Sequence, residues 1–238
     1  MSAAFDSLNR FYASSIGKKI LVALTGLMLI GFVFGHMVGN LLIFAGPDAI
    51  NDYGHLLQTA LHGGGVWIAR AGLLAAVVIH VVATISLTKA NKAARPDAYA
   101  QHKAQVSSKA SQTMIWSGLT LLAFIVYHLL HFTVRVGNDF GSAAYVYKTD
   151  EHGHTVHNVY KMVIDGFSWA PASIFYLIAM ALLCSHLSHG FSSLFQTLGI
   201  STDKSEPLFK KAGYAFAGLI FAGNAAIVLS IWLFGYGR

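Results

Sequence analysis

Residues 20–47, ILVALTGLMLIGFVFGHMVGNLLIFAGP, decide the fold, because this run contains no Asp, Glu, Lys or Arg. A helix that crosses the hydrocarbon core of a bilayer needs roughly 20 mainly apolar residues. Four later stretches are equally free of charge, and each is long enough for one span: residues 71–88, 110–134, 166–202 and 212–237. The sequence therefore predicts an all-α integral membrane bundle of five transmembrane helices.

The composition supports this prediction. Of the 238 residues, 55% are hydrophobic and only 11% are charged, and the mean hydropathy is +0.57. An ordinary soluble domain carries roughly twice that share of charge, so a cytosolic enzyme, a disordered tail and a nucleic-acid-binding protein are excluded. Cys184 is the only cysteine, which excludes a disulfide within the chain and a thiolate metal site made by this chain alone.

The chain is predicted to form one membrane domain, residues 1–238. We expect spans at about residues 18–45, 66–90, 109–136, 168–197 and 208–236, with Pro171 in the first turn of the fourth. The longest connection, residues 137–165, holds strand-like runs at 144–148 and 156–163, which predict an outer hairpin or short cap. Asp6 and Arg10 argue against a cleavable signal peptide, so the first span is expected to act as an uncleaved insertion signal.

The basic residues predict the orientation of the bundle. Eleven of the 16 Lys and Arg residues lie in the N-terminal segment and in the second and fourth connections, where the net charge is +7. The opposite segments have a net charge of −1. By the positive-inside rule, the N-terminus is predicted to be cytoplasmic and the C-terminus to lie outside. The basic excess is therefore a topology signal.

Six histidines fall inside four of the predicted spans, where ionisable residues are costly and often mark function: His36, His80, His128, His131, His186 and His189. One such histidine often only hydrogen-bonds a neighbouring helix, but four consecutive helices each carry at least one. At 1.5 Å per residue, His36 and His128 lie roughly 25 Å and 28 Å in from the cytoplasmic side. His186 lies roughly 25 Å in from the outer side, and His80 roughly 13 Å from the cytoplasmic edge. The depths give two pairs, His36 with His128 outside and His80 with His186 inside.

Two histidine pairs stacked in depth on four helices are the arrangement that two haems need. Neutral imidazole is a good axial ligand for haem iron, and two imidazoles leave no open position, which suits electron transfer. Gly31, Gly35 and Gly39 form a small-residue stripe beside His36, typical equally of haem contact and of helix packing. A zinc or copper site would instead bring its ligands to one depth.

A second group of histidines, His152, His154 and His157, lies in the predicted outer turn. No carboxylate or thiolate spacing completes a zinc site there, so we interpret these residues as histidines of a solvated turn.

The chain resembles the di-haem cytochrome b membrane-anchor subunit of succinate:menaquinone oxidoreductases (succinate dehydrogenases) and the related fumarate reductases. The resemblance covers residues 14–235 and is carried by the order of four ligand helices followed by a fifth without a ligand. The matching segments are SIGKK at 15–19, GHMVGN at 35–40, VIH at 78–80 followed by Lys89, YH at 127–128, and SHLSHG at 185–190.

The resemblance implies two haem b groups. It makes His36 and His128 ligands of the distal haem, and His80 and His186 ligands of the proximal haem. In each i, i+3 doublet the family pattern favours the earlier histidine, so His131 and His189 are expected to contact the ligands or the haem propionates. Arg70 and Arg135 are further candidates for the propionates.

The resemblance also implies a larger complex in a bacterial cytoplasmic membrane. A flavoprotein subunit with covalent FAD and an iron–sulfur subunit would dock on the cytoplasmic connections, residues 90–110 and 199–211. Succinate chemistry would take place in those subunits, and this chain would pass electrons between them and menaquinone. The direction, succinate oxidation or fumarate reduction, stays open.

The candidate quinone residues lie in or beside the first outer loop: Asn40, Asp52, Tyr53, His55 and Gln58. Some relatives use a glutamate near this end, but the first glutamate here is Glu151. The proton donor is therefore unassigned, with Asp52 or His55 as the stand-ins, and an ordinary polar loop is at least as good an interpretation.

Two other functions compete with this one. The first is a haem b membrane subunit of another quinone-linked complex, of the hydrogenase or formate dehydrogenase type, but those usually have four helices and a different ligand spacing. The second is a transporter with a histidine proton relay. Such a transporter predicts broken helices or internal repeats, and neither is evident in the sequence.

Overall fold

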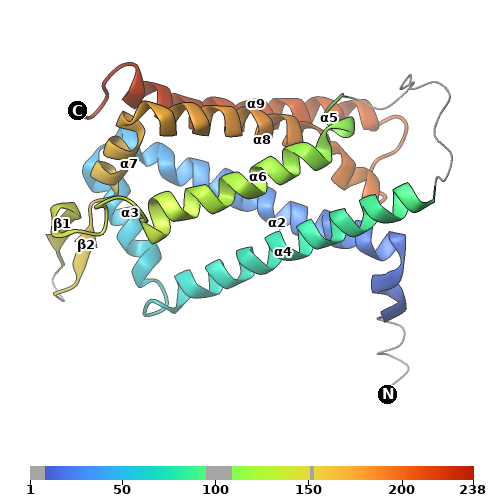
Figure 1. Cartoon of the computed structure of the whole chain (residues 1–238), viewed down its shortest axis with the longest axis horizontal. Coiled ribbons are helices and arrows are strands. Elements are labelled where there is room, and N and C mark those ends of the chain that lie inside the picture. Colours follow the sequence, from blue (N-terminus) through green and yellow to red (C-terminus); the bar gives the residue numbers. More distant parts are fainter. Residues whose placement is uncertain (1–8, 95–108, 151–152) are drawn as a thin grey trace.

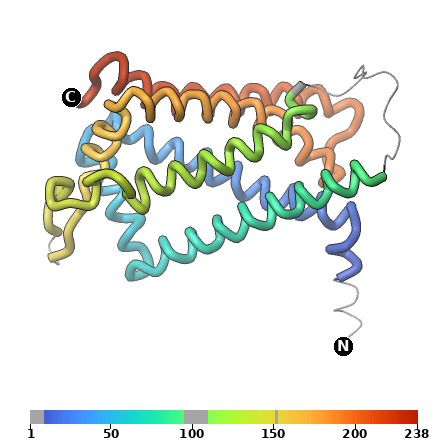
Figure 2. The backbone as a smooth tube through the Cα atoms, in the orientation of Figure 1, coloured from blue at the N-terminus to red at the C-terminus, as the bar shows by residue number. Residues whose placement is uncertain are grey.

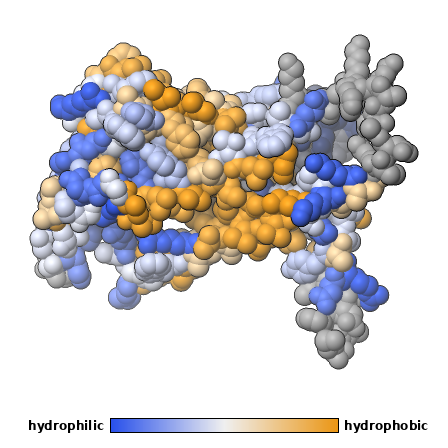
Figure 3. Space-filling model, in the orientation of Figure 1, coloured by the Kyte–Doolittle hydropathy of each residue, from blue (hydrophilic) through white to orange (hydrophobic). Residues whose placement is uncertain are grey.

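The structure, a computed structural model, describes residues 9–94, 109–150 and 153–238. In this part of the chain, five helical segments are long and apolar enough to cross a membrane: Ser15–Ala45, Gly64–Ala93, Met114–Val134, Ala170–Thr197 and Glu206–Trp232. They lie side by side in one bundle (Figure 1). Figure 3 shows an apolar band across the middle of the visible face, with hydrophilic residues towards both ends. The predicted all-α bundle of five spans is confirmed.

The five spans are built from seven elements. The first is α2 (Ser15–Leu41), which continues into the 3-10 turn η1 (Leu42–Ala45), and the second is α4 (Gly64–Ala93). The third is α6 (Met114–His128), which follows the short α5 (Lys109–Gln112) and continues into the π-helical turn η2 (Leu129–Val134). The last two are α8 (Ala170–Thr197) and α9 (Glu206–Trp232). All five spans begin and end within a few residues of the predicted bounds.

The helices do not pack evenly on one another. Helices α8 and α9 run together along their length, α2 packs on α4, and α6 packs on α8 (Figure 2). Helix α4 barely touches α6 and is held mainly by α2. Small residues allow the closest approach: a Cβ atom on Gly213 of α9 would lie 2.9 Å from the backbone oxygen of Ser188 on α8.

A small cap covers one end of the bundle, which we call the cap end. It consists of α3 (Pro47–Thr59), the turn η3 (Ala143–Tyr145), the antiparallel strands β1 (Val146–Thr149) and β2 (Thr155–His157), and α7 (Val159–Ser168). The C-terminus lies at this end, whereas the first described residues and α5 lie at the other (Figure 1).

The first connection differs from the predicted polar loop, because most of it is the helix α3. The start of this helix is favoured by Pro47 in its first turn, where a missing amide hydrogen does no harm, and by Asp48, whose charge suits a helix N-terminus. Ile50 is buried on its inner face. The helix turns Asp52, Tyr53, His55 and Gln58 towards different neighbours.

The second predicted strand run is also wrong beyond residue 157. The hairpin exists, but β2 ends at His157 and α7 begins at Val159. The Asn158 side chain accepts a hydrogen bond from the backbone amide of Lys161 at 2.9 Å, and this N-cap starts the helix. The apolar residues after His157 therefore pack inward from a helix, with Met162 and Ile164 buried.

Polar contacts join the parts of the cap. The fully buried Asn51 of α3 accepts a hydrogen bond from the amide of Tyr160 at 2.9 Å, and its amide group lies 3.4 Å from the Asn158 side-chain oxygen. On the outer side, Lys148 of β1 pairs with Asp52 at 2.8 Å, and this carboxylate raises the pKa of the lysine. Helix α3 is thus fixed to both α7 and the hairpin.

Candidate functional site

His36 and His128 face each other near the cap end, and we call them the cap-side pair. They come from α2 and α6, their ring centroids are 5.7 Å apart, and their planes are nearly perpendicular at 87°. Phe32 stacks on His36 at 5.3 Å, and Phe124 lies 5.9 Å from His128. The structure therefore brings together the two histidines that depth alone had paired.

The glycine stripe beside His36 divides into two parts. A Cβ atom on Gly39 would lie 2.6 Å from the Tyr53 ring, so this glycine allows α3 to pack on α2. At Gly31 and Gly35 nothing lies within 4 Å of the same position, so the helix surface there is open to a flat group or to lipid. Helix packing thus accounts for only one end of the stripe.

His80 and His186 lie further from the cap end, and we call them the deep pair. They come from α4 and α8 and lie within electrostatic range of each other. Each is supported from a neighbouring helix by a hydroxyl group. The Nδ1 atom of His80 is 3.1 Å from Oγ1 of Thr25 on α2, and that of His186 is 3.1 Å from Oγ of Ser117 on α6.

A glycine follows each of these hydroxyl residues. A Cβ atom on Gly26 would lie 3.5 Å from Cε1 of His80, and one on Gly118 would lie 3.5 Å from Cε1 of His186. Each imidazole therefore lies over a hydroxyl–glycine step of the next helix, and a side chain at the glycine would meet the imidazole ring. The same local arrangement occurs twice, on α2 and on α6.

The hydroxyl groups favour one tautomer of the deep pair. Thr25 donates its hydroxyl hydrogen to the backbone oxygen of Leu21 at 2.6 Å, and Ser117 donates to that of Met114 at 3.1 Å. With the hydroxyl hydrogens placed on these backbone oxygens, each hydroxyl oxygen accepts a hydrogen bond from the imidazole Nδ1–H. A neutral imidazole that carries its proton on Nδ1 keeps a lone pair on Nε2. Each residue of the deep pair therefore presents the nitrogen that binds a metal.

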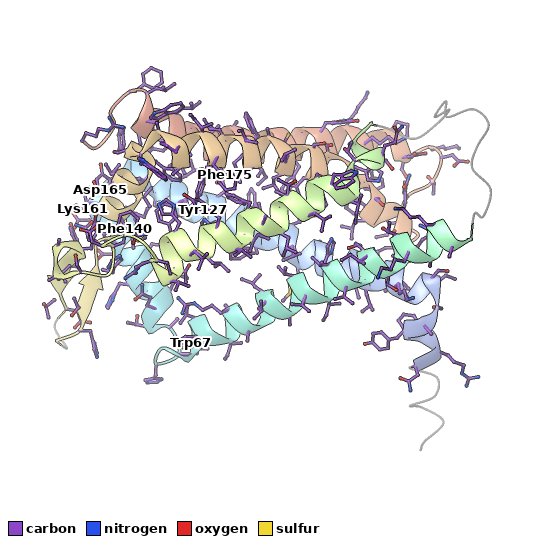
Figure 4. All side chains as sticks on the ribbon, viewed as in Figure 1. Trp67, Tyr127, Phe140, Lys161, Asp165 and Phe175 are labelled. Carbon is purple, nitrogen blue, oxygen red and sulfur yellow. The ribbon has the colours of Figure 1, made fainter. Side chains whose placement is uncertain are left out.

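The later histidine of each doublet has different surroundings. His131 lies in η2 among aromatic rings, with Phe132 at 4.0 Å and Phe140 at 5.7 Å. His189 lies one turn beyond His186 and close to Lys210 of α9. Figure 4 shows Phe140 beside the cap, with Tyr127 and Phe175 between α6 and α8.

The two candidate propionate arginines lie in different places. Arg70 is exposed near the start of α4, and its guanidinium stacks on the Trp67 ring at 4.8 Å. Arg135 ends η2 with a left-handed backbone (φ 64°), and its Nε atom is buried with no hydrogen-bond partner among the described residues. An unpaired buried donor of this kind is costly, so Arg135 is suited to an anionic group.

The candidate quinone residues do not converge on one site. Asp52 pairs with Lys148, and His55 lies 3.2 Å from Asp150, so both hold the hairpin on α3. Tyr53 packs on Gly39, as described above. Asn40 is half-buried near the end of α2, and Gln58 is exposed near the end of α3.

The histidines of the cap form no metal centre in the part of the chain that the structure describes, where no group of three or more His, Cys, Asp or Glu residues could hold a metal ion. His154 contacts Asp150, and His157 lies 3.5 Å from the Met162 sulfur. His152 is outside the described residues.

His157 makes the cap sensitive to acid. Burial, and to a smaller extent the charge of Arg135, lower the pKa of His157 from 6.5 to about 4. As the pH falls from 6.5 towards 4, the unfolded cap binds a proton that the folded cap does not, so the folded cap loses stability in this window and is most stable above it. Because His157 is only half-buried, we expect a loss of about 1 kcal/mol. Hydrogen exchange of the hairpin amides, corrected for intrinsic rates, measures it.

His157→Phe is the control for this experiment. The phenyl ring keeps the packing beside Tyr145, but it does not titrate. His55 and His154, which contact Asp150, are unchanged in the variant, so the difference between the two proteins isolates His157. An equal loss of protection in both proteins would show that other groups cause the acid sensitivity.

The predicted docking connections are only partly described. Most of residues 90–110 lies outside the described residues. In residues 199–211, Lys204, Lys210 and Lys211 are exposed, and Lys210 pairs with Glu206 at 2.7 Å. This end of the bundle therefore presents positive charge.

Sequence reasoning missed the hydroxyl groups that orient the histidines. Thr25 and Ser117 are polar residues followed by glycine inside apolar spans, and this pattern was visible in the sequence. Tyr176 of α8, whose hydroxyl contacts both His128 and His131, had no comparable signal.

Compared with known proteins, the chain matches no family model, no curated protein and no solved structure.

Proposed function

We propose that this chain is the membrane-anchor and electron-transfer subunit of a succinate dehydrogenase (succinate:quinone oxidoreductase) and carries two b haems. One observation supports this proposal most strongly: four spans provide two histidine pairs at different depths, and a hydroxyl group from a neighbouring helix contacts Nδ1 of each deep imidazole. A histidine that only joined two helices by a hydrogen bond would not need a second histidine at the same depth on another helix.

The residues present fit haem. His36 and His128 would hold one group, and His80 and His186 the other, each through neutral imidazole nitrogen. Phe32 and Phe124 provide apolar contacts around the cap-side pair, and Arg135 provides an unpaired buried donor for a propionate. When bound, a bis-histidine haem supplies reversible one-electron transfer without an open position for oxygen.

The protein contributes position and protection from water. Thr25 and Ser117 orient the deep imidazoles and keep the proton on Nδ1, away from the coordinating nitrogen. In a bilayer, the apolar surfaces of the spans would keep water away from both pairs. Since the two pairs lie at different depths, electrons would cross the membrane in two steps.

The rest of the proposal concerns partners and location. The lysine-bearing end would face the cytoplasm of a bacterium, where the flavoprotein with FAD and the iron–sulfur subunit would dock. Menaquinone would exchange electrons near the cap-side pair. The chain itself would not oxidise succinate.

A redox spectrum tests the proposal. The purified chain should show two b-type haems per polypeptide in a reduced-minus-oxidised spectrum and in a pyridine haemochrome assay. A colourless protein, isolated from cells that are supplied with haem, would overturn it. The matched control is the variant in which all four ligand histidines are changed to alanine, which should bind no haem.

The electron donor distinguishes this complex from the alternative quinone-linked complexes. In native membranes, succinate should reduce both haems, and deletion of the chain should release the flavoprotein from the membrane. Reduction by hydrogen or formate, and not by succinate, would favour the hydrogenase or formate dehydrogenase type.

A further inference from the structure

Tyr176 links the two histidines of the α6 doublet. Its hydroxyl group lies 3.1 Å from Nδ1 of His128 and 3.2 Å from Nδ1 of His131. The side chain is only 5% exposed, and Phe124 and Phe167 hold its ring by edge-to-face contacts at 5.0 Å and 4.9 Å. The tyrosine is therefore a fixed hydrogen-bonding group.

A single hydroxyl group makes the two histidines unequal. A tyrosine hydroxyl carries one proton, so it donates one hydrogen bond and accepts the other. One histidine must then donate from Nδ1–H to the tyrosine oxygen, and the other must accept at a bare Nδ1. In neutral imidazoles, the first histidine has a lone pair on Nε2 and the second has a proton there.

The proposed haem site decides which histidine is the donor. His128 faces His36 across the cap-side pair, whereas His131 points among Phe132 and Phe140. For His128 to bind a metal opposite His36, its Nε2 must carry the lone pair. Its Nδ1–H then donates to Tyr176, and Tyr176 donates to Nδ1 of His131, which leaves His131 with a proton on Nε2.

We propose that Tyr176 selects His128, and not His131, as the haem ligand by imposing opposite tautomers on the two. The selection of a ligand and the assignment of each tautomer rest on the proposed function, whereas the opposition of the two tautomers follows from the single hydroxyl proton of Tyr176. Tyr176 is a positioning residue that acts through His128. Its hydrogen bond also makes the His128 imidazole a stronger electron donor, since a partner for the second ring nitrogen raises ligand basicity.

The tautomers are tested by nitrogen NMR of the full chain with labelled histidine, reduced with dithionite so that any bis-histidine haem is diamagnetic. We expect Nδ1–H for His128 and Nε2–H for His131. In Tyr176→Phe, which keeps the ring packing, His131 should become a mixture of tautomers. The opposite assignment in the wild type, or unchanged tautomers in the variant, would overturn the proposal.

A redox titration tests ligand selection with a matched pair of variants. Tyr176→Phe should raise the midpoint potential of the haem at the cap-side pair alone, because a less basic ligand stabilises the oxidised iron less. Thr25→Val should do the same only at the deep pair. Two haems with unshifted potentials in Tyr176→Phe would refute the role of Tyr176 while leaving the function intact. A wild-type chain without haem would refute the function instead.

Discussion

His128→Ala is expected to remove half of the haem from the purified chain, and His36→Ala should remove the same half. Each variant leaves the iron with one protein ligand at a site in apolar surroundings. His80→Ala and His186→Ala should remove the other half. The haem content and the midpoint potential of the remaining haem measure this result.

The controls for this prediction are the later histidines of the doublets. His131→Ala and His189→Ala should keep both haems, because neither side chain faces a partner histidine. If His131→Ala loses a haem and His128→Ala keeps it, the ligand assignment on α6 is wrong. If His36→Ala and His128→Ala remove haems of different potential, the pairing itself is wrong.

Asn51→Leu is expected to destabilise the cap by about 2–3 kcal/mol. The leucine keeps the branched shape of the asparagine side chain but leaves the buried amide of Tyr160 without its acceptor, and it removes the contact between α3 and Asn158. The start of α7 should then separate more easily from α3. Faster hydrogen exchange at the α7 amides, and a lower thermal midpoint in the same detergent, would report the loss.

Asn224→Leu provides the matched control. Asn224 lies in α9, and its side-chain amide bonds only the backbone oxygen of Ile220, one turn earlier in the same helix. Its loss leaves no partner from another element unsatisfied, so the effect should stay below about 1 kcal/mol. Equal effects of the two substitutions would show that the bond between α3 and α7 has no special importance for the cap.

The spans were predictable because a bilayer imposes a simple requirement on length and charge. Charge-free runs of sufficient length located all five helices, and a rise of 1.5 Å per residue grouped the histidines into pairs that the structure also brings together. Both arguments depend on single helices, whose geometry is regular. Neither needs knowledge of which helices touch.

The cap was predicted less well because its structure depends on contacts distant in sequence. Residues 156–163 have the apolar character of a strand, but the Asn158 cap starts a helix within them. Helix α3 depends on Tyr53 packing against Gly39 and on the bond from Asn51 to Tyr160. Polar residues between two spans do not reveal these partners.

The sequence identified the histidines of the candidate site but not the hydrogen bonds that orient their imidazoles. The sequence supplied the imidazoles and their depth. It could not show that the hydroxyl groups of Thr25, Ser117 and Tyr176 contact the Nδ1 atoms of four of these imidazoles, because each contact joins two different helices. The choice between His128 and His131 depends on one hydroxyl group from α8.

The hydroxyl–glycine steps have a consequence for the distance between the two pairs. Thr25 precedes His36 by 11 residues on α2, and Ser117 precedes His128 by 11 residues on α6. Eleven residues complete about three turns, so each support and ligand share a helix face, separated by about 16 Å. Helices α2 and α6 therefore have the same spacing. Each carries one histidine of the cap-side pair and the hydroxyl group that contacts one histidine of the deep pair. A shift of either helix along its axis would disturb the cap-side pair and the deep pair at once, so the spacing between the two pairs depends on the regular rise of these two helices.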